Sequence, residues 1–304
     1  MKIVLGTDLS EEALGAAKWA FGLAGSLRAQ KRPYELTLMH VTMGPKWGAS
    51  VQATFEDPDN QFRLEKMIKD WLEPHVDASL DYTIIYAEGN PVKELRDWSK
   101  AHHADWLVVG MTGHGAFARM MVGSTAHRLA QRPPCKMAVI HPEHALLNKS
   151  ARFLVGIDFL DSSLEALATA AEHARVLDAS LHIVHVVNAI RAVALPNGLI
   201  GYSGGPTEMV ELEAGARRDL AELVEANAEL LQGVPHTHEV LSGHPTRALI
   251  DHAKEQDFDA ICLGTVGRSV LDDFMLGSVA SGVLRHMPTT ILLSPPPKNS
   301  AQQR

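Results

Sequence analysis

Cysteine is scarce in this chain: its 304 residues include two, Cys135 and Cys262, and neither belongs to a Cys-x-x-Cys motif. Both lie in apolar runs that favour strands, so the sequence indicates buried thiols rather than disulfides or a cysteine-ligated metal. No apolar run approaches the ~18 residues that a membrane-spanning helix needs. The opening Met-Lys-Ile-Val-Leu-Gly lacks the features of a secretory leader. We therefore expect a cytoplasmic protein with no membrane partner.

Positive charge is also in short supply. The formal net charge is −8, with 28 Lys and Arg against 36 Asp and Glu. Residues 1–148 carry 16 basic against 17 acidic side chains and residues 149–304 carry 12 against 19, so the halves are −1 and −7. The chain has no basic run, which argues against nucleic acid as a partner.

A glycine pattern occurs twice, with the spacing G-x2-G-x9-G-S. The first copy is Gly110, Gly113, Gly123 and Ser124, and the second is Gly264, Gly267, Gly277 and Ser278. Each pair of positions is separated by the same offset (264 − 110 = 154), and Asp105 and Asp259 share it. The repeat and the length predict two similar domains, at residues 1–141 and 151–295.

Each half alternates runs typical of strands with amphipathic helices. The expected strands are residues 2–7, 36–41, 80–86, 105–109 and 136–140, then 153–157, 181–187, 236–241, 259–263 and 290–293. Residues 188–206 are expected to form a loop, and residues 208–231 a long helix. This alternation predicts an α/β fold in which each domain has a five-stranded parallel sheet of order 3-2-1-4-5 with helices on both faces.

Ligands of such sheets bind beyond the carboxyl ends of the strands, where the strand order reverses. Strands one and four end at Asp8 and Gly110 in the first half and at Asp158 and Gly264 in the second. A glycine there lets a ligand approach the backbone closely. Gly-Ser at the following helix start offers amide groups and the positive end of the helix dipole, which together suit a phosphate.

On these residues the chain resembles the universal stress protein family in its tandem two-domain form. The doubled glycine pattern is that family's nucleotide-binding motif. The resemblance implies two Rossmann-like (HUP-type) domains that form an intramolecular pseudo-dimer with paired fifth strands. It also implies ATP as the ligand. Whether Mg²⁺ is required, and whether two chains form a homodimer, stays open. The implied role is a nucleotide-linked module in stress response or signalling, with an unknown protein partner.

The resemblance also implies which residues bind the nucleotide. In the first half they are Thr7, Asp8, Val41, Gly110, Met111, Gly113, His114, Gly115, Gly123, Ser124 and Thr125. In the second half they are Asp158, Val186, Gly264, Thr265, Gly267, Arg268, Gly277, Ser278 and Val279. The aspartates and valines are expected at the adenosine end, since a carboxylate repels phosphate but accepts hydrogen bonds from amino and hydroxyl groups. The glycines and serines are expected to hold ribose and phosphates.

Other interpretations stay open at this point. Slow ATP hydrolysis or phosphoryl transfer would need a base near the γ-phosphate, and the loop lacks a Walker-type Lys-Ser/Thr pair. A nucleotide-independent scaffold and an electron-transfer flavoprotein-like module share the general architecture. We also expect tighter binding in the first half, because Arg119 lies in its loop whereas Asp272 and Asp273 lie in the second.

Two further patterns are expected to carry no site. Ser203-Gly-Gly205 resembles the start of a pyrophosphatase-type phosphate loop, but it follows the wrong strand and lacks the Asp-Ser that such a loop needs. Histidines occur as His102-His103, as His236-x-His238 and as His182 with His185. No Cys, Asp or Glu partner stands at ligand spacing in the sequence, so we expect hydrogen-bonded or solvated histidines and no metal or catalytic residue.

Overall fold

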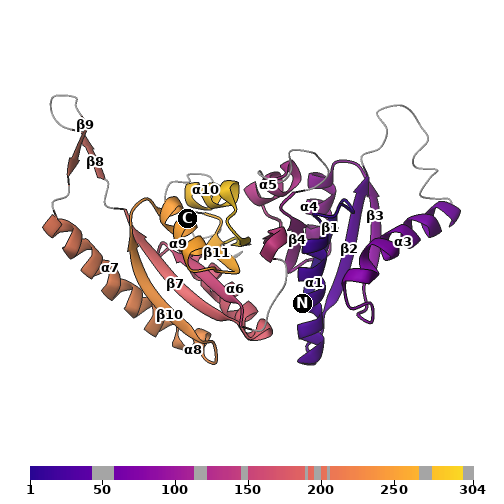
Figure 1. The fold of residues 1–304 in the computed structure, drawn as a ribbon, viewed down its shortest axis with the longest axis horizontal. Helices are drawn as coiled ribbons and strands as arrows, with labels where there is room; N and C mark the ends of the chain where they lie inside the picture. The colour runs from indigo at the N-terminus through magenta and orange to yellow at the C-terminus, as the bar shows by residue number, and fades with distance from the viewer. Residues whose placement is uncertain are drawn as a thin grey trace. The chain divides into compact units, whose positions relative to one another are not determined.

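The structure is a computed structural model of the whole chain. It describes residues 1–42, 58–112, 122–144, 150–188, 191–194, 200–203, 206–266 and 276–296. The chain divides into two compact units, residues 1–148 with 289–293 and residues 149–288 with 294–304. Within each unit strands and helices alternate, as Figure 1 shows. No helix of the described residues is both long and apolar enough to span a bilayer.

Unit 1 contains a parallel sheet in the order β3-β2-β1-β4-β5. Its strands are β1 (Lys2–Thr7), β2 (Glu35–Thr42), β3 (Thr83–Glu88), β4 (Trp106–Gly110) and β5 (Lys136–Ile140). The helices are α1 (Leu14–Ala29), α3 (Pro58–Leu72), α4 (Pro91–Ala101) and α5 (Ser124–Gln131), with short 3₁₀ turns at Glu73–His75 and Pro142–His144. A late strand of the chain, β12 (Thr290–Ser294), lies antiparallel to β5, as the implied pairing of the fifth strands requires.

Unit 2 repeats this order as β10-β7-β6-β11. Its strands are β6 (Arg152–Ile157), β7 (Ser180–Val187), β10 (His236–Ser242) and β11 (Ala260–Gly264). Its helices are α6 (Asp161–Leu177), α7 (Pro206–Ala226), α8 (Ala228–Leu231), α9 (Pro245–Glu255) and α10 (Ser278–His286). The Thr265 amide donates to the Ser294 carbonyl at 3.0 Å, as the Met111 amide donates to Ile140 at 2.9 Å in unit 1. The predicted fold class and strand order are confirmed.

Right-handed crossovers place the helices on both faces of each sheet. In unit 2, α6 and α7 therefore cover one face, and α9 and α10 cover the other. The central strands β6 and β11 are mostly buried between these layers, and the corresponding β1 and β4 of unit 1 have no exposed residue. In unit 1, the small side chains of the alanine-rich α1 let the helix approach the sheet closely. Its Trp19 packs against Trp106 of β4 with ring centroids 5.9 Å apart.

The repeated aspartate at the start of the fourth strand has a structural role. The Asp105 carboxylate accepts the Lys2 amide at 2.7 Å, and the Asp259 carboxylate accepts the Arg152 amide at 2.7 Å. Each contact ties the start of the first strand of its half to the start of the fourth. Both lie at the end of the sheet opposite Gly110 and Gly264.

Two segments differ from the sequence prediction. Residues 188–206, expected as a loop, include an antiparallel hairpin of β8 (Arg191–Ala194) and β9 (Ile200–Ser203). The proline and the glycine between the two short strands favoured a loop in the sequence. The helix expected at 208–231 divides into α7 and α8 at Asn227. The Asn227 side chain donates to the Leu223 carbonyl at 2.8 Å, so it competes with the helical backbone at that point.

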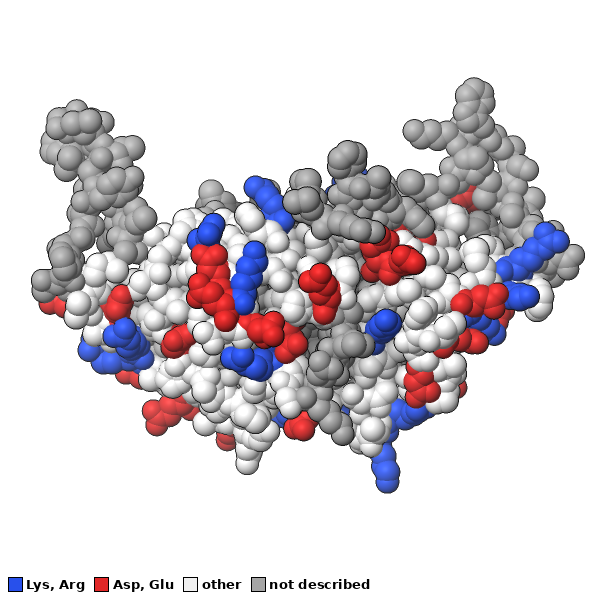
Figure 2. All heavy atoms as spheres, in the orientation of Figure 1, with Lys and Arg blue, Asp and Glu red and all other residues white. Residues whose placement is uncertain are grey.

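Charges of both signs are interspersed on the visible face of the described residues (Figure 2). Ion pairs one helical turn apart among the described residues include Lys93 with Asp97 at 2.9 Å and Arg247 with Asp251 at 2.6 Å.

Candidate functional site

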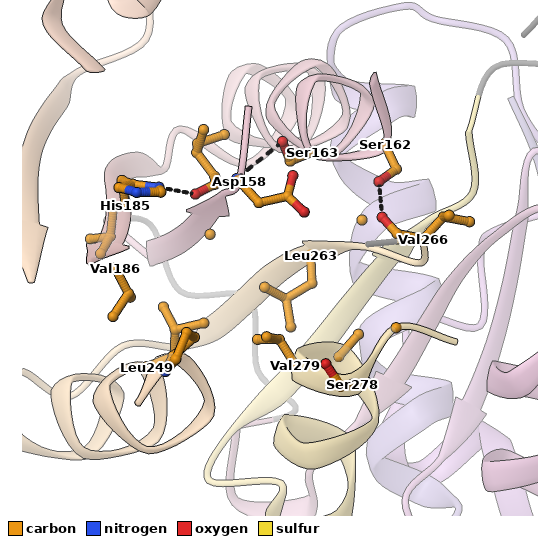
Figure 3. Close-up of a pocket in the computed structure, with 17 residues that line it drawn as sticks. Asp158, Ser162, Ser163, His185, Val186, Leu249, Leu263, Val266, Ser278 and Val279 are labelled. Atoms are coloured by element: carbon orange, nitrogen blue, oxygen red, sulfur yellow. Dashed lines mark hydrogen bonds between the residues drawn. The ribbon is translucent and has the colours of Figure 1, made fainter. Parts of the chain in front are cut away.

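A cavity of about 240 Å³ lies at the carboxyl ends of the strands of unit 2 (Figure 3). Its walls come from the ends of β6, β7 and β11, the starts of α6, α9 and α10, and the turns between them. The lining residues are Gly156, Ile157, Asp158, Ser162, Ser163, Val184, His185, Val186, Pro245, Leu249, Leu263, Gly264, Val266, Gly277, Ser278, Val279 and Ala280. This is the position that the strand order predicts for a ligand.

Asp158 follows β6 at one end of the cavity and is held by a tight turn. Its carboxylate accepts the Leu160 amide at 3.1 Å, and its own amide donates to the Ser163 hydroxyl at 3.3 Å. Between them Phe159 adopts a left-handed backbone with φ 63°, which costs energy for a bulky side chain. Residues held in such sparsely populated backbone regions cluster at functional sites.

Apolar side chains form the wall across from Asp158. Leu249 of α9, Leu263 of β11 and Val279 of α10 are grouped there in Figure 3. A Cβ added at Gly156 would lie 2.7 Å from Leu263, so this glycine makes room for the wall. A surface with one carboxylate and an apolar wall suits a flat aromatic base that carries hydrogen-bond donors.

The opposite end of the cavity is the start of α10. Gly277 is its N-cap, with φ −57° and ψ 156°, and provides no side-chain cap for the first helical amides. The Gly277 amide donates to the Thr265 carbonyl at 2.7 Å, which fixes the helix start beside the end of β11. Because the first amides of a helix have no partner within the helix, this end attracts an anion such as phosphate.

Lys and Arg are missing from the residues that line the cavity, and its one ionisable acid is Asp158. Any positive attraction from the described part of the site therefore comes from the helix dipole and backbone amides rather than from a basic side chain. Ser162 helps to shape the site, since its hydroxyl donates to the Val266 carbonyl.

Unit 1 repeats much of this arrangement. Asp8 follows β1, and its carboxylate accepts the amide and hydroxyl of Ser10 at 3.1 and 2.6 Å. Leu9 is left-handed with φ 62°, as Phe159 is in the second half. The Gly123 amide donates to the Met111 carbonyl at 2.7 Å, and α5 starts at Ser124 without a side-chain cap. The two halves thus share the strained turn, the aspartate and the uncapped helix start.

A histidine that the sequence reading did not assign to the site occurs in both halves. His40 Nδ1 lies 2.9 Å from the Thr7 carbonyl, and His185 Nδ1 lies 2.8 Å from the Ile157 carbonyl. Each histidine therefore fastens the end of the second strand to the end of the first, just before the aspartate. The signal was present as a His-Val dipeptide at the end of each second strand.

The predicted residues fall into three groups. Those that line the cavity are Asp158, Val186, Gly264, Gly277, Ser278 and Val279, and Thr265 follows Gly264 with its side chain buried. Those at the equivalent strand ends and helix start of unit 1 are Thr7, Asp8, Val41, Gly110, Met111, Gly123, Ser124 and Thr125. Those outside the described residues are Gly113, His114, Gly115, Arg119, Gly267, Arg268, Asp272 and Asp273.

The cavity also includes residues that the sequence did not single out. Ser162 and Ser163 stand at the start of α6, and Pro245 and Leu249 come from α9. The serines follow Asp158 by four and five residues in the sequence, so position alone could have suggested them. Nothing in the sequence indicates that α9 reaches the site, because that depends on how the helix packs over the sheet.

The histidine and phosphate-loop patterns have different outcomes. Ser203 lies in β9, and residues 204–205 lie outside the described part of the chain. No acidic residue stands at ligand spacing from the histidines in the sequence, but in the structure His182 Nε2 lies 2.9 Å from Glu239. Strand pairing brings Glu239 close from 57 residues away, which spacing along the sequence does not show.

Comparisons with known proteins agree on one family. The model of the universal stress protein family matches residues 1–141 and again 150–295. A universal stress protein of Mycobacterium tuberculosis is 29% identical over 297 residues, covering 93% of this chain and 92% of its own. A universal stress protein of Mycolicibacterium smegmatis is 27% identical over 308 residues, covering 97% of each. The crystal structure of a universal stress protein from Archaeoglobus fulgidus has a TM-score of 0.68 at 20% identity over 97% of this chain and 98% of its own.

Proposed function

Since the chain belongs to the universal stress protein family, as a tandem of two family domains, we propose that it binds an adenine nucleotide. The domains are taken as residues 1–141 and 151–295, the boundaries that the internal repeat indicates. One nucleotide occupies the cavity of unit 2, and a second occupies the corresponding strand ends of unit 1. The protein acts as a nucleotide-linked regulatory module in stress response or signalling.

The observation that carries this proposal is the division of the cavity into two chemically distinct ends. At one end, Asp158 with Leu249 and Leu263 matches a nucleoside, because the carboxylate accepts hydrogen bonds from the ribose or base while the two leucines pack against the ring. The uncapped start of α10 at the other end matches phosphate. A ligand that is aromatic at one end and anionic at the other fits both.

A binding role is favoured over hydrolysis by the position of the titratable groups. Asp158 stands at the nucleoside end, away from the α10 start. His185 uses its Nδ1 on the Ile157 carbonyl. Among the lining residues, Ser278 provides the hydroxyl group at the start of α10. Its neighbours in the sequence are Gly277 and Val279, which carry neither a carboxylate nor an imidazole. A general base for phosphoryl transfer is thus not provided by the described cavity.

Mass spectrometry of the nucleotide released by denaturing the freshly purified full chain tests the proposal. Release of ATP, ADP or another adenine nucleotide is the expected result. Calorimetric titration with ATP then locates the site, using Val186→Trp to fill the cavity at the nucleoside end and the exposed Val210→Trp on α7 as the matched control. Loss of binding at unit 2 in the first variant, with binding kept in the second, supports the proposal. A chain that neither carries nor binds adenine nucleotides would instead be an interaction scaffold.

A further inference from the structure

Three metal-binding side chains from separate elements of unit 2 meet at one point. His182 lies on β7, Glu239 on β10 and His252 on α9. The Nε2 atoms of His182 and His252 lie 2.9 and 3.0 Å from the same carboxylate oxygen, Oε1 of Glu239. The ligand atoms of the three residues lie within 4.8 Å of one another. We propose that this His182–Glu239–His252 cluster is a binding site for a divalent transition-metal ion of the zinc type.

The composition of the cluster selects the class of ion. Two imidazoles and one carboxylate form a known ligand set for Zn²⁺, with a fourth position left for water. Imidazole nitrogen favours zinc-type ions, whereas Mg²⁺ and Ca²⁺ take oxygen ligands. Ligand atoms about 2.1 Å from a tetrahedral ion stand roughly 3.4 Å apart. The histidine-to-carboxylate separations here therefore need to widen by only about half an ångström to admit the ion.

The Nε2 atom of His252 gives an independent indication. It is shielded from solvent and, within the described part of the chain, makes no hydrogen bond of acceptable geometry. Glu239 is close enough for one at 3.0 Å, but its direction is wrong. A buried nitrogen without a well-aimed partner costs free energy. An ion held between His252 and Glu239 would supply that partner.

The histidine rings are held in place before any ion binds. His182 and His252 stack with centroids 5.2 Å apart, and both pack on the buried Phe258 at 5.4 and 5.6 Å. His182 Nδ1 lies 2.7 Å from the Thr237 hydroxyl, its direct neighbour on β10. Metal-ligating histidines use their second ring nitrogen in this way, since the partner fixes the ring orientation and the tautomer.

The cluster is open to ions from one side. The histidine side chains are 18% and 15% exposed, whereas that of Glu239 is 42% exposed, so the carboxylate faces solvent and the rings lie behind it. Two further charges act on His252 with opposite sign, those of Glu255 and Arg152. The Arg152 guanidinium stacks on Phe258 at 4.5 Å and donates to the Gln256 carbonyl at 2.6 Å, so it is engaged elsewhere.

The internal repeat shows that this cluster is specific to the second half. The offset of 154 matches Glu239 with Ile85 and His252 with Trp98. The strand register matches His182 with Thr37, because Glu239 pairs with the residue two places after His182 and Ile85 with the residue two places after Thr37. None of these three is His, Cys, Asp or Glu. The duplicated fold therefore does not require the cluster, and it is separate from the nucleotide site that both halves share. An ion here would tie α9 to the β7–β10 edge of the sheet.

The test uses the full chain stripped of metal with a chelator. We expect about one equivalent of Zn²⁺ to bind by calorimetry, and Co²⁺ to bind with the intense visible absorption of a four- or five-coordinate site. Zn²⁺ should raise Tm, and Mg²⁺ should not. Glu239→Gln keeps the size of the exposed side chain and should weaken Zn²⁺ binding more than about 10-fold, as should His252→Gln, while Thr237→Val should weaken it roughly 10-fold.

The controls separate this site from adventitious binding. His238→Gln changes an exposed histidine on the same strand, and His144→Gln changes another histidine group, His141–Glu143–His144, of the described residues. Both should leave the affinity and the Co²⁺ spectrum unchanged. If His252→Gln does not fold, Glu239→Gln still decides the matter. Absence of Zn²⁺ binding, or binding that Glu239→Gln leaves intact or that His144→Gln abolishes, would overturn the proposal.

Discussion

The end of β11 touches the start of α6 where Gly264 meets Ser162. A Cβ at Gly264 would lie 2.6 Å from both the carbonyl carbon and the carbonyl oxygen of Ser162. At the corresponding Gly110 of unit 1, an added Cβ would lie 3.5 Å from the Ala13 Cα and the Glu12 carbonyl oxygen at the start of α1, and 3.2 Å from the Thr112 carbonyl oxygen of its own loop. The second copy of the strand-to-helix contact is therefore the tighter of the two.

Gly264→Ala should destabilise unit 2 by roughly 1–3 kcal/mol, because backbone atoms of α6 or β11 must move apart. Gly110→Ala should cost less than about 1 kcal/mol, since its neighbour needs to shift by a few tenths of an ångström. Urea unfolding of the two variants compares these costs directly. Equal losses of stability would show that α6 can move away from β11 freely.

Ser278→Asp should weaken ATP binding at unit 2 while leaving the fold at least as stable. A carboxylate in the first turn of α10 favours the helix by about 0.3–1 kcal/mol but repels a phosphate at the same place. Ser278→Asn is the uncharged control, and Ser124→Asp makes the same change at the exposed start of α5. Calorimetry should show each aspartate affecting its own site. Unchanged ATP affinity in both aspartate variants would place the phosphates elsewhere.

The stability of unit 1 should fall as the pH drops below about 6.5, the ordinary pKa of histidine. Burial lowers the pKa of His141, with a further contribution from the charge of His144. The folded state thus favours neutral His141, whose Nδ1 accepts the Glu143 amide at 3.2 Å, and the unfolded state gains a proton first. His141→Asn retains an acceptor that does not titrate. Its urea midpoint should fall less than that of the wild type between pH 7 and pH 5, and an identical fall would contradict this assignment.

The two thiols should differ sharply in reactivity. Cys262 is 1% exposed in β11, and burial raises the pKa of its thiol, so almost no thiolate is available at pH 8. Cys135 is partly exposed. In a Cys135→Ser variant, a colorimetric thiol reagent should label Cys262 only after urea is added. Fast labelling of the native variant would mean that β11 opens readily.

Much of the architecture could be predicted because it depends on local sequence patterns and because those patterns occur in both halves of the chain. Apolar strand runs, the amphipathic helices and the glycine offset of 154 residues were sufficient for the order 3-2-1-4-5. Helix α4 begins at Pro91, where Pro91 and the N-cap Asn90 are strong local signals of a helix start. The hairpin of β8 and β9 was missed because its strands are four residues each and enclose a proline and a glycine.

The site was less predictable because most of its walls depend on contacts between distant elements. Asp158 and Gly277 stand at ends of elements, where a sequence pattern is informative. Leu249 reaches the cavity because α9 packs over β7 and β10. Glu239 meets His182 because β10 pairs with β7 in one particular register. Neither relationship can be read from spacing along one chain.

The pairing of β12 with β5 has a consequence for synthesis of the chain. Val139 pairs with Ile291, so 152 residues (291 − 139) separate two neighbours in one sheet. On the ribosome, the β5 edge of unit 1 is therefore completed only after nearly the whole second half has been made. Until then, β5 presents unpaired amides and carbonyls that another chain can use. A stalled or shortened product ending before residue 289 would keep that edge and self-associate through it, so the last strand acts as the protection of the first unit against aggregation.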